Sequence, residues 1–132
     1  MKVKVNLKVK EKPEYAIKNH EQMKFISDSL KDISGFSVET KSRLTGYTSA
    51  RIVFAYFCKK NGIFICDIAR FLQLHHASVH YHLDRAKAYL SQDDDMKEWF
   101  DLVTDRYIEY KKSRTLMEAI KKKKALEQRI KD

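Results

Sequence analysis

The stretch that decides the fold is residues 65–83, ICDIARFLQLHHASVHYHL. Small and apolar residues recur in it at helical spacing, in two groups separated by a polar break at Gln73. The first group is Ile68, Ala69 and Leu72, and the second is Val79 and Leu83. Each group would form the inward face of a helix, and a small residue such as Ala69 lets two helices cross closely. The stretch therefore predicts a short helix, a tight turn and a second helix, which is the helix-turn-helix arrangement.

The start of the second predicted helix is polar, whereas its later turns are partly apolar. The residues at that start are His75, His76, Ala77 and Ser78. In a helix-turn-helix protein this end of the second helix reaches base edges in the major groove of double-stranded DNA. We therefore predict that these four residues contact DNA.

Three further motifs flank this stretch. They are Lys41-Ser42-Arg43, Ala50-Arg51 followed by an apolar run, and Asp95-Met96-Lys97-Glu98-Trp99-Phe100. With His75-His76-Ala77-Ser78-Val79 they resemble, in the same order, motifs of the C-terminal DNA-binding domain of bacterial replication initiators of the DnaA type. That family has a basic loop, an Ala-Arg helix start, an Asp-His-Thr-Thr-Val recognition string and an Asp-Ile-Lys-Glu-x-Phe stretch. The resemblance spans residues 36–107.

The resemblance implies a Trp-repressor-like helix-turn-helix fold and a role in DNA binding. It implies that Lys41 and Arg43 contact the DNA backbone or minor groove. Arg51 would support a phosphate contact or the packing at the start of its helix. A small accessory or regulatory factor of replication or transcription, from a bacterium, phage or mobile element, would fit this resemblance.

The chain departs from the family pattern at the positions that read bases. His75 replaces the family's Asp, Ala77 replaces its first Thr, and Gln73-Leu74 replaces Gly-Arg. Base recognition depends on side-chain donors and acceptors. These changes predict a different target sequence or weaker specificity. Because Leu74 and Ala77 are apolar, the surface is alternatively a protein-interaction module that has lost base readout.

The composition is typical of a basic, helical protein. The chain has 132 residues, 43% of them hydrophobic, with only three glycines and one proline, and its net charge is +9. Few glycines and prolines favour long helices, and a strong positive charge favours a polyanionic partner such as nucleic acid. We expect an all-α helical bundle. Its parts would be a basic arm at 1–12, a helical domain at 13–107 and a basic helical extension at 108–132.

The positive charge is unevenly distributed. Residues 49–91 hold six basic and two acidic residues, and residues 105–132 hold ten basic and five acidic. Residues 92–104 hold one basic and five acidic. Both chain ends and the helix-turn-helix region could therefore contact phosphates.

The boundaries of the remaining elements follow from local signals. Residues 1–10 alternate between apolar and mostly basic residues, which indicates either a strand or a flexible arm. A helix should run from about residue 13 to 33 and end at Gly35. We predict a turn at residues 45–48, with Thr48 as the N-cap of the next helix. Asn61-Gly62 should end that helix.

The C-terminal segment, residues 95–131, predicts one long helix or two. Trp99, Phe100 and Val103 should complete the core. An apolar stripe continues through Tyr107, Tyr110, Met117 and Ile120 and then fades into a run of lysines. The extension either pairs with a partner helix, from a second copy or another protein, or is a solvated basic tail.

No cofactor or metal is expected. Cys66 and four histidines cluster in the sequence, but paired-cysteine spacing is missing. We interpret the histidines as polar groups at the DNA-facing tip, with His82 on the surface. Their protonation would strengthen DNA binding at lower pH.

Catalysis is poorly supported, and we expect no enzyme. His80-Tyr81-His82 resembles the His-hydrophobic-His motif of rolling-circle nucleases, with Tyr107 or Tyr110 as nucleophile, but its flanks have helical spacing. A phosphate-binding glycine loop is also missing from the sequence. Cys58 and Cys66 each follow an apolar residue and should be buried, reduced thiols, as in a cytoplasmic protein. We expect no signal peptide and no membrane span.

Overall fold

The computed structural model describes residues 14–131 and consists of five helices, with no strand in that range. The helices are α2 (Glu14–Ser34), α3 (Thr45–Lys60), α4 (Ile65–Leu72), α5 (His76–Gln92) and α6 (Asp94–Lys131). The prediction of an all-α bundle is confirmed. The predicted arm or strand at residues 1–12 lies outside the described residues.

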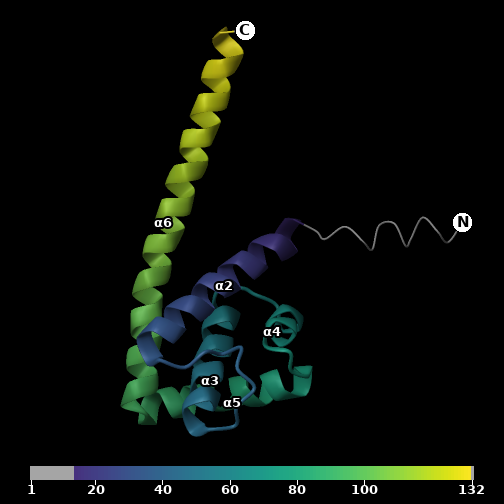
Figure 1. Cartoon of the computed structure of the whole chain (residues 1–132), viewed down its shortest axis with the longest axis vertical. Helices are drawn as coiled ribbons and strands as arrows, with labels where there is room; N and C mark the ends of the chain where they lie inside the picture. The colour runs from purple at the N-terminus through teal and green to yellow at the C-terminus, as the bar shows by residue number, and fades with distance from the viewer. Residues whose placement is uncertain (1–13, 132) are drawn as a thin grey trace, which may run out of the picture.

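Helix α3 is the centre of the bundle, and α2, α4, α5 and α6 all pack against it (Figure 1). Its apolar run continues around the helix rather than along one stripe, as expected of a helix covered on most sides. The side chains of Val53, Phe54 and Ala55 are fully buried. The aromatic rings of Phe57 and Phe100 meet edge to face, 5.5 Å apart, which joins α3 to α6.

Helices α4 and α5 form the predicted short helix, turn and second helix. Four of the five expected inward residues are buried, including Ile68 and Val79, each with 0% exposure, and the fifth, Leu83, is partly buried against the core. Gln73 ends α4 in the left-handed conformation, with φ 56° and ψ 46°. The Leu74 N–H then donates to the Ala69 carbonyl at 2.9 Å, which closes the turn. α5 begins at His76.

Helix α3 starts four residues earlier than predicted, so the predicted turn at 45–48 and the predicted cap at Thr48 are wrong. Residues 45–48 form the first turn of the helix, and Leu44 is the N-cap without a side-chain hydrogen bond. Gly46 is needed for packing rather than for a turn, because a Cβ there would overlap the ring of Phe36. The predicted helix ends at Gly35 and at Asn61-Gly62 are confirmed, and both glycines have positive φ.

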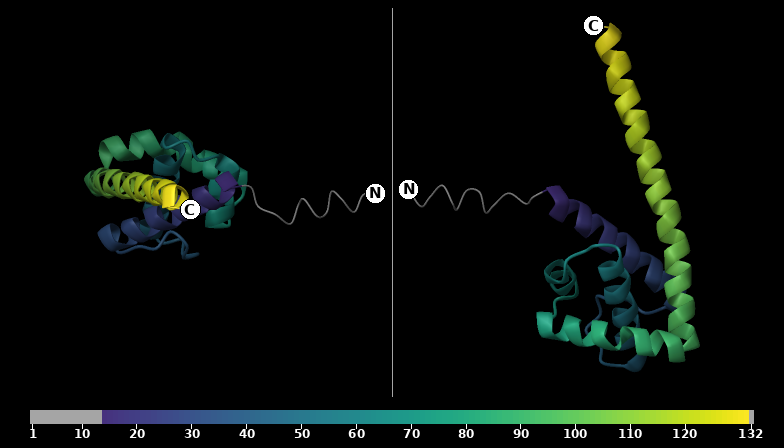
Figure 2. Two further views of the ribbon diagram at one scale, coloured as in Figure 1. Left: turned by 90° about the horizontal axis from the view of Figure 1, so that it is seen from above. Right: turned by 180° about the vertical axis from the view of Figure 1, so that it is seen from behind.

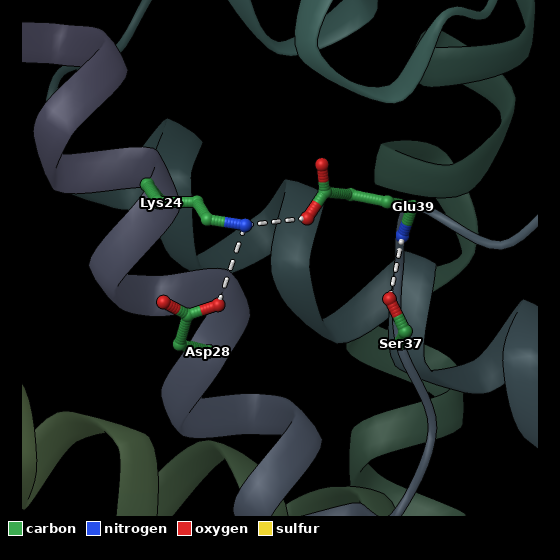
Figure 3. A network of polar contacts seen from close by, with 4 residues as sticks. All are labelled: Lys24, Asp28, Ser37 and Glu39. Carbon is green, nitrogen blue, oxygen red and sulfur yellow. Dashed lines mark hydrogen bonds and ion pairs between the residues drawn. The ribbon is translucent and has the colours of Figure 1, made fainter.

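The loop between α2 and α3 is fastened to α2 by a small polar network (Figure 3). The Lys24 ammonium contacts Glu39 at 3.1 Å and Asp28 at 3.5 Å. The Glu39 N–H donates to the Ser37 hydroxyl at 3.3 Å. The hydrogen bond and charge of Glu39 raise the pKa of Lys24 above its usual value. This network holds the first half of the loop, and the second half reaches α5.

The C-terminal segment is one continuous helix, the first of the two predicted alternatives. Val103 and Tyr107 are buried and Trp99 and Phe100 pack on the core, as predicted. α2 crosses this part of α6, and an ion pair of 3.1 Å joins Arg114 of α6 to Glu21 of α2. Beyond it the helix projects away from the bundle (Figure 2).

The two cysteines lie in different environments. Cys58 is fully buried on α3, as predicted, and burial raises the pKa of its thiol well above the usual value. Cys66 is exposed, so its predicted burial is wrong. The inward face of α4 is set by Ile68 and Leu72, and position 66 points away from that face.

Candidate nucleic-acid interface

A hollow of about 560 Å³ opens where the loop between α2 and α3 meets the turn between α4 and α5. Four segments meet there, namely the loop at 40–43, the start of α3, the end of α4 with the turn that follows it, and the first two turns of α5. Its lining residues are Thr40, Lys41, Ser42, Arg43, Thr48, Arg51, Leu72, Leu74, Ala77, Ser78, Tyr81 and His82. The hollow is therefore built by residues from the predicted basic loop and from the predicted recognition helix.

The charge of this lining is entirely positive at neutral pH. Lys41, Arg43 and Arg51 contribute three cations, and none of the lining residues is a carboxylate. Low-dielectric walls around charges of one sign focus their field and favour an anion. The hollow is thus suited to a negatively charged group such as phosphate.

Arg51 holds the loop in place. Its Nη1 donates to the Thr40 carbonyl at 2.7 Å, and its Nη2 donates to the Ser42 carbonyl at 2.6 Å. The planar guanidinium can satisfy two carbonyls at once, which an ammonium group cannot match in geometry. Burial lowers the pKa of Arg51 from its usual value, but an arginine remains charged in proteins. In the structure the Arg51 guanidinium thus fastens the loop to the start of α3.

The two cations of the loop itself, Lys41 and Arg43, have different surroundings. The Lys41 Nζ donates to the Gln73 carbonyl at 3.0 Å, which ties the loop to the turn between α4 and α5. Arg43 is exposed and makes no hydrogen bond or ion pair within the part of the chain that the structure describes. Arg43 is therefore the loop cation that is available to an external anion.

The first turn of α5 presents its backbone N–H groups at the same place. His75 is the N-cap, with φ −71° and ψ 152°, and its side chain makes no capping bond. Its carbonyl accepts the N–H of Ser78 at 3.0 Å. Ala77 and Ser78 line the hollow, whereas His75 and His76 are exposed beside it and do not line it. The structure thus brings together five of the seven predicted site residues.

Two further residues of this surface were not predicted. Tyr81 is 53% exposed, and the Arg85 guanidinium lies 3.7 Å from its ring centroid. Both share the face of Ser78, at spacings of three and seven residues. Helical spacing from Ser78 was the signal that would have identified them. An exposed tyrosine stacked by an arginine adds a flat, cationic surface next to the hollow.

His82 is not on the surface, so that prediction is wrong. It is half-buried in the hollow, and its Nδ1 atom has no hydrogen-bond partner among the described residues. Burial and the nearby charge of Arg51 lower the pKa of His82 below its usual value of 6.5. His82 therefore remains neutral where an exposed histidine begins to gain a proton.

The other chemical alternatives can be compared with the same geometry. His80 is exposed and His82 faces the hollow on α5, so the two rings of the His-x-His motif do not converge. In residues 14–131 no group of three or more His, Cys, Asp and Glu side chains is placed to hold a metal ion. None of the described helices is long and apolar enough to cross a membrane.

Comparison of the chain with protein-family models, curated proteins and solved structures found no match.

Proposed function

We propose that the protein binds double-stranded DNA through α4 and α5, acting as a helix-turn-helix unit. The start of α5 would enter the major groove, with His75, His76, Ala77 and Ser78 next to the base edges. The loop at 40–43 would lie on the adjacent backbone or minor groove, where Arg43 contacts phosphate. The chain would serve as a small accessory or regulatory factor rather than an enzyme.

One observation carries this proposal. The loop at 40–43, with Lys41 and Arg43, and Arg51 of α3 bring three cations and no carboxylate to the lining of a hollow of about 560 Å³ beside the exposed first turn of α5. The positive end of the helix dipole and the free N–H groups of that turn favour an anion at the same place. Phosphate contacts fix the position of a protein on DNA, and the neighbouring helix tip then reads the bases.

The hydrogen bonds of Arg51 and Lys41 support the same conclusion. They join the loop to α3 and to the turn before α5, so the phosphate-contacting and base-contacting parts have a fixed spacing before DNA arrives. Fixed spacing reduces the ordering cost of binding. The resemblance of residues 36–107 to the DnaA-type DNA-binding domain gives independent support from the sequence.

The proposal is tested by fluorescence anisotropy of the full chain on a pool of random duplexes across a salt series, with sequencing of the bound fraction. Binding should weaken steeply with salt because counterions are released from DNA. Arg43→Ala should cost about 1–3 kcal/mol of binding free energy and reduce the salt slope by about one. His76→Ala should reduce the enrichment of the selected sequence.

Lys59→Ala is the matched control. Lys59 is exposed at the far end of α3, about 20 Å along the helix from its start, and its loss changes the net charge as much as the loss of Arg43 does. Equal effects of the two variants would contradict a defined contact at Arg43. A flat salt response would reject DNA binding and favour the protein-interaction alternative, in which Leu74 and Ala77 contact a protein.

A further inference from the structure

The projecting part of α6 exposes apolar side chains that no part of the bundle covers. Residues 115–128 are all exposed. They include Leu116 at 62%, Ile120 at 45% and Leu126 at 57% exposure. Helix formers fill this segment, so it continues from the packed half of α6, but packing rather than propensity provides most helical stability in proteins. The segment therefore has the character of a helix that packs on another.

One exposed stripe runs along almost all of α6. Its positions are separated alternately by four and three residues, so they share one face of the helix. The stripe consists of Glu98, Leu102, Asp105, Glu109, Lys112, Leu116, Ala119, Lys123 and Leu126, and all nine side chains are exposed. We call these residues the α6 seam. The bundle packs on the other side of α6, through Met96, Val103 and Tyr107.

The charge of the α6 seam changes sign at its middle. Its charged residues are acidic in the first half, up to Glu109, and basic in the second half, from Lys112. A parallel pair of such helices would place every charged residue opposite its own copy. An antiparallel pair would place the acidic half of each helix against the basic half of the other. The charges of two α6 seams are therefore complementary only when the two helices run antiparallel.

We propose that two copies of this chain associate through antiparallel pairing of their α6 seams. In the antiparallel arrangement with the best charge match, Glu98 lies opposite Lys123 of the second copy and Glu109 lies opposite Lys112. Leu102 packs on Ala119, and no like charges meet. Asp105 lies opposite Leu116 and Asp95 lies opposite Leu126, and these are the two mismatched layers. This inference rests on α6 alone and does not depend on DNA binding.

The molecular mass in solution tests the proposal. Light scattering after size-exclusion chromatography, on nuclease-treated full-length protein over a dilution series, should show 15.6 kDa at low concentration and twice that mass at high concentration. Raising the salt concentration should shift the transition to higher protein concentration, because the charge pairs are exposed. A single mass of 15.6 kDa at every concentration would overturn the proposal.

Two charge-reversal variants identify the surface. Glu98→Lys with Glu109→Lys makes the seam basic, and Lys112→Glu with Lys123→Glu makes it acidic. Each variant alone should raise the dissociation constant about tenfold or more, since symmetry places every pair in the dimer twice. An equimolar mixture should form a heterodimer. Lys111→Glu with Lys121→Glu, off the seam, is the matched control and should leave the association unchanged.

Cross-linking tests the direction of pairing. In a Cys66→Ser background, which removes the exposed thiol, Leu102→Cys and Ala119→Cys chains should form a disulfide only when mixed. Efficient cross-linking of Leu102→Cys with itself would indicate parallel pairing and overturn the antiparallel arrangement. Association that is unaffected by both charge reversals would place the interface elsewhere and would overturn the role of the seam.

Discussion

Two basic regions of this molecule, the hollow beside α5 and the projecting part of α6, are supported in different ways. At the hollow, Arg51 and Lys41 donate to three backbone carbonyls, and the apolar residues behind them are buried. In the projecting part of α6 the lysines and apolar residues alike are exposed. The geometry of the first region is fixed by contacts within the chain, so a ligand would meet a preorganised surface. The projecting part of α6 would be packed only if a partner covered it, so similar charge alone does not define similar function.

The largest expected difference between the packed bundle around the hollow and the projecting part of α6 is in the effect of shortening one apolar side chain on stability. Ile68→Ala removes a fully buried side chain of α4, and it should lower the free energy of unfolding by about 2–5 kcal/mol. Leu116→Ala removes a side chain that is 62% exposed, and at low protein concentration it should change the same quantity by less than about 0.5 kcal/mol. Denaturant unfolding monitored by the single tryptophan, Trp99, measures both effects.

Protein concentration sharpens the same experiment. If α6 packs on a second copy, the effect of Leu116→Ala, a change on the α6 seam, should grow as the protein concentration rises, because association stabilises the folded state by mass action. The effect of Ile68→Ala should not show this growth. Equal effects of the two truncations at low concentration would mean that the projecting part of α6 is packed within one chain.

A second comparison concerns two arginines of the hollow. Arg51→Ala should lower the free energy of unfolding by about 1–3 kcal/mol, because it leaves the Thr40 and Ser42 carbonyls without their charged donor. Arg43→Ala should leave stability nearly unchanged and act on DNA binding alone. Arg51→Lys keeps the charge but loses the two-carbonyl geometry, so it should recover only part of the stability. Thermal unfolding of the three variants without DNA separates these cases.

The sequence was sufficient for the parts of the fold that depend on local pattern. The periodicity of Ile68, Leu72 and Val79 predicted α4 and α5, and two glycines with positive φ marked helix ends correctly. The sequence was not sufficient where contacts between residues distant in the chain determine the structure. Gly46 was taken for a turn residue, but the ring of Phe36 is what requires a glycine there.

The sequence predicted which residues form the candidate site better than it predicted the contacts that hold them together. Lys41, Arg43 and Ser78 were expected to act together, and they do line one hollow. The hydrogen bonds of Arg51 to backbone carbonyls left no signal in the sequence, because any residue supplies a carbonyl. His82 was misplaced for a related reason, since its burial depends on the loop that packs over α5.

The smallest expected effect is a dependence of stability on pH. It should arise at the hollow, through His82, and not in the projecting part of α6. The folded state lowers the pKa of His82 below 6.5, through burial and the charge of Arg51. As the pH falls through the usual histidine range, the unfolded chain therefore binds a proton at position 82 before the folded chain does. Unfolding becomes easier at lower pH, and this contribution levels off below the folded pKa.

The variant His82→Gln isolates this titration from those of the exposed histidines. The difference in unfolding free energy between wild type and variant should move against the wild type as the pH falls from about 7.5 to 5. Parallel curves would contradict the burial of His82. The helical content of α6 should stay constant over the same range, because its projecting part holds lysines and arginine but no histidine. Acidification would then loosen the α5 end of the molecule while leaving the α6 seam intact.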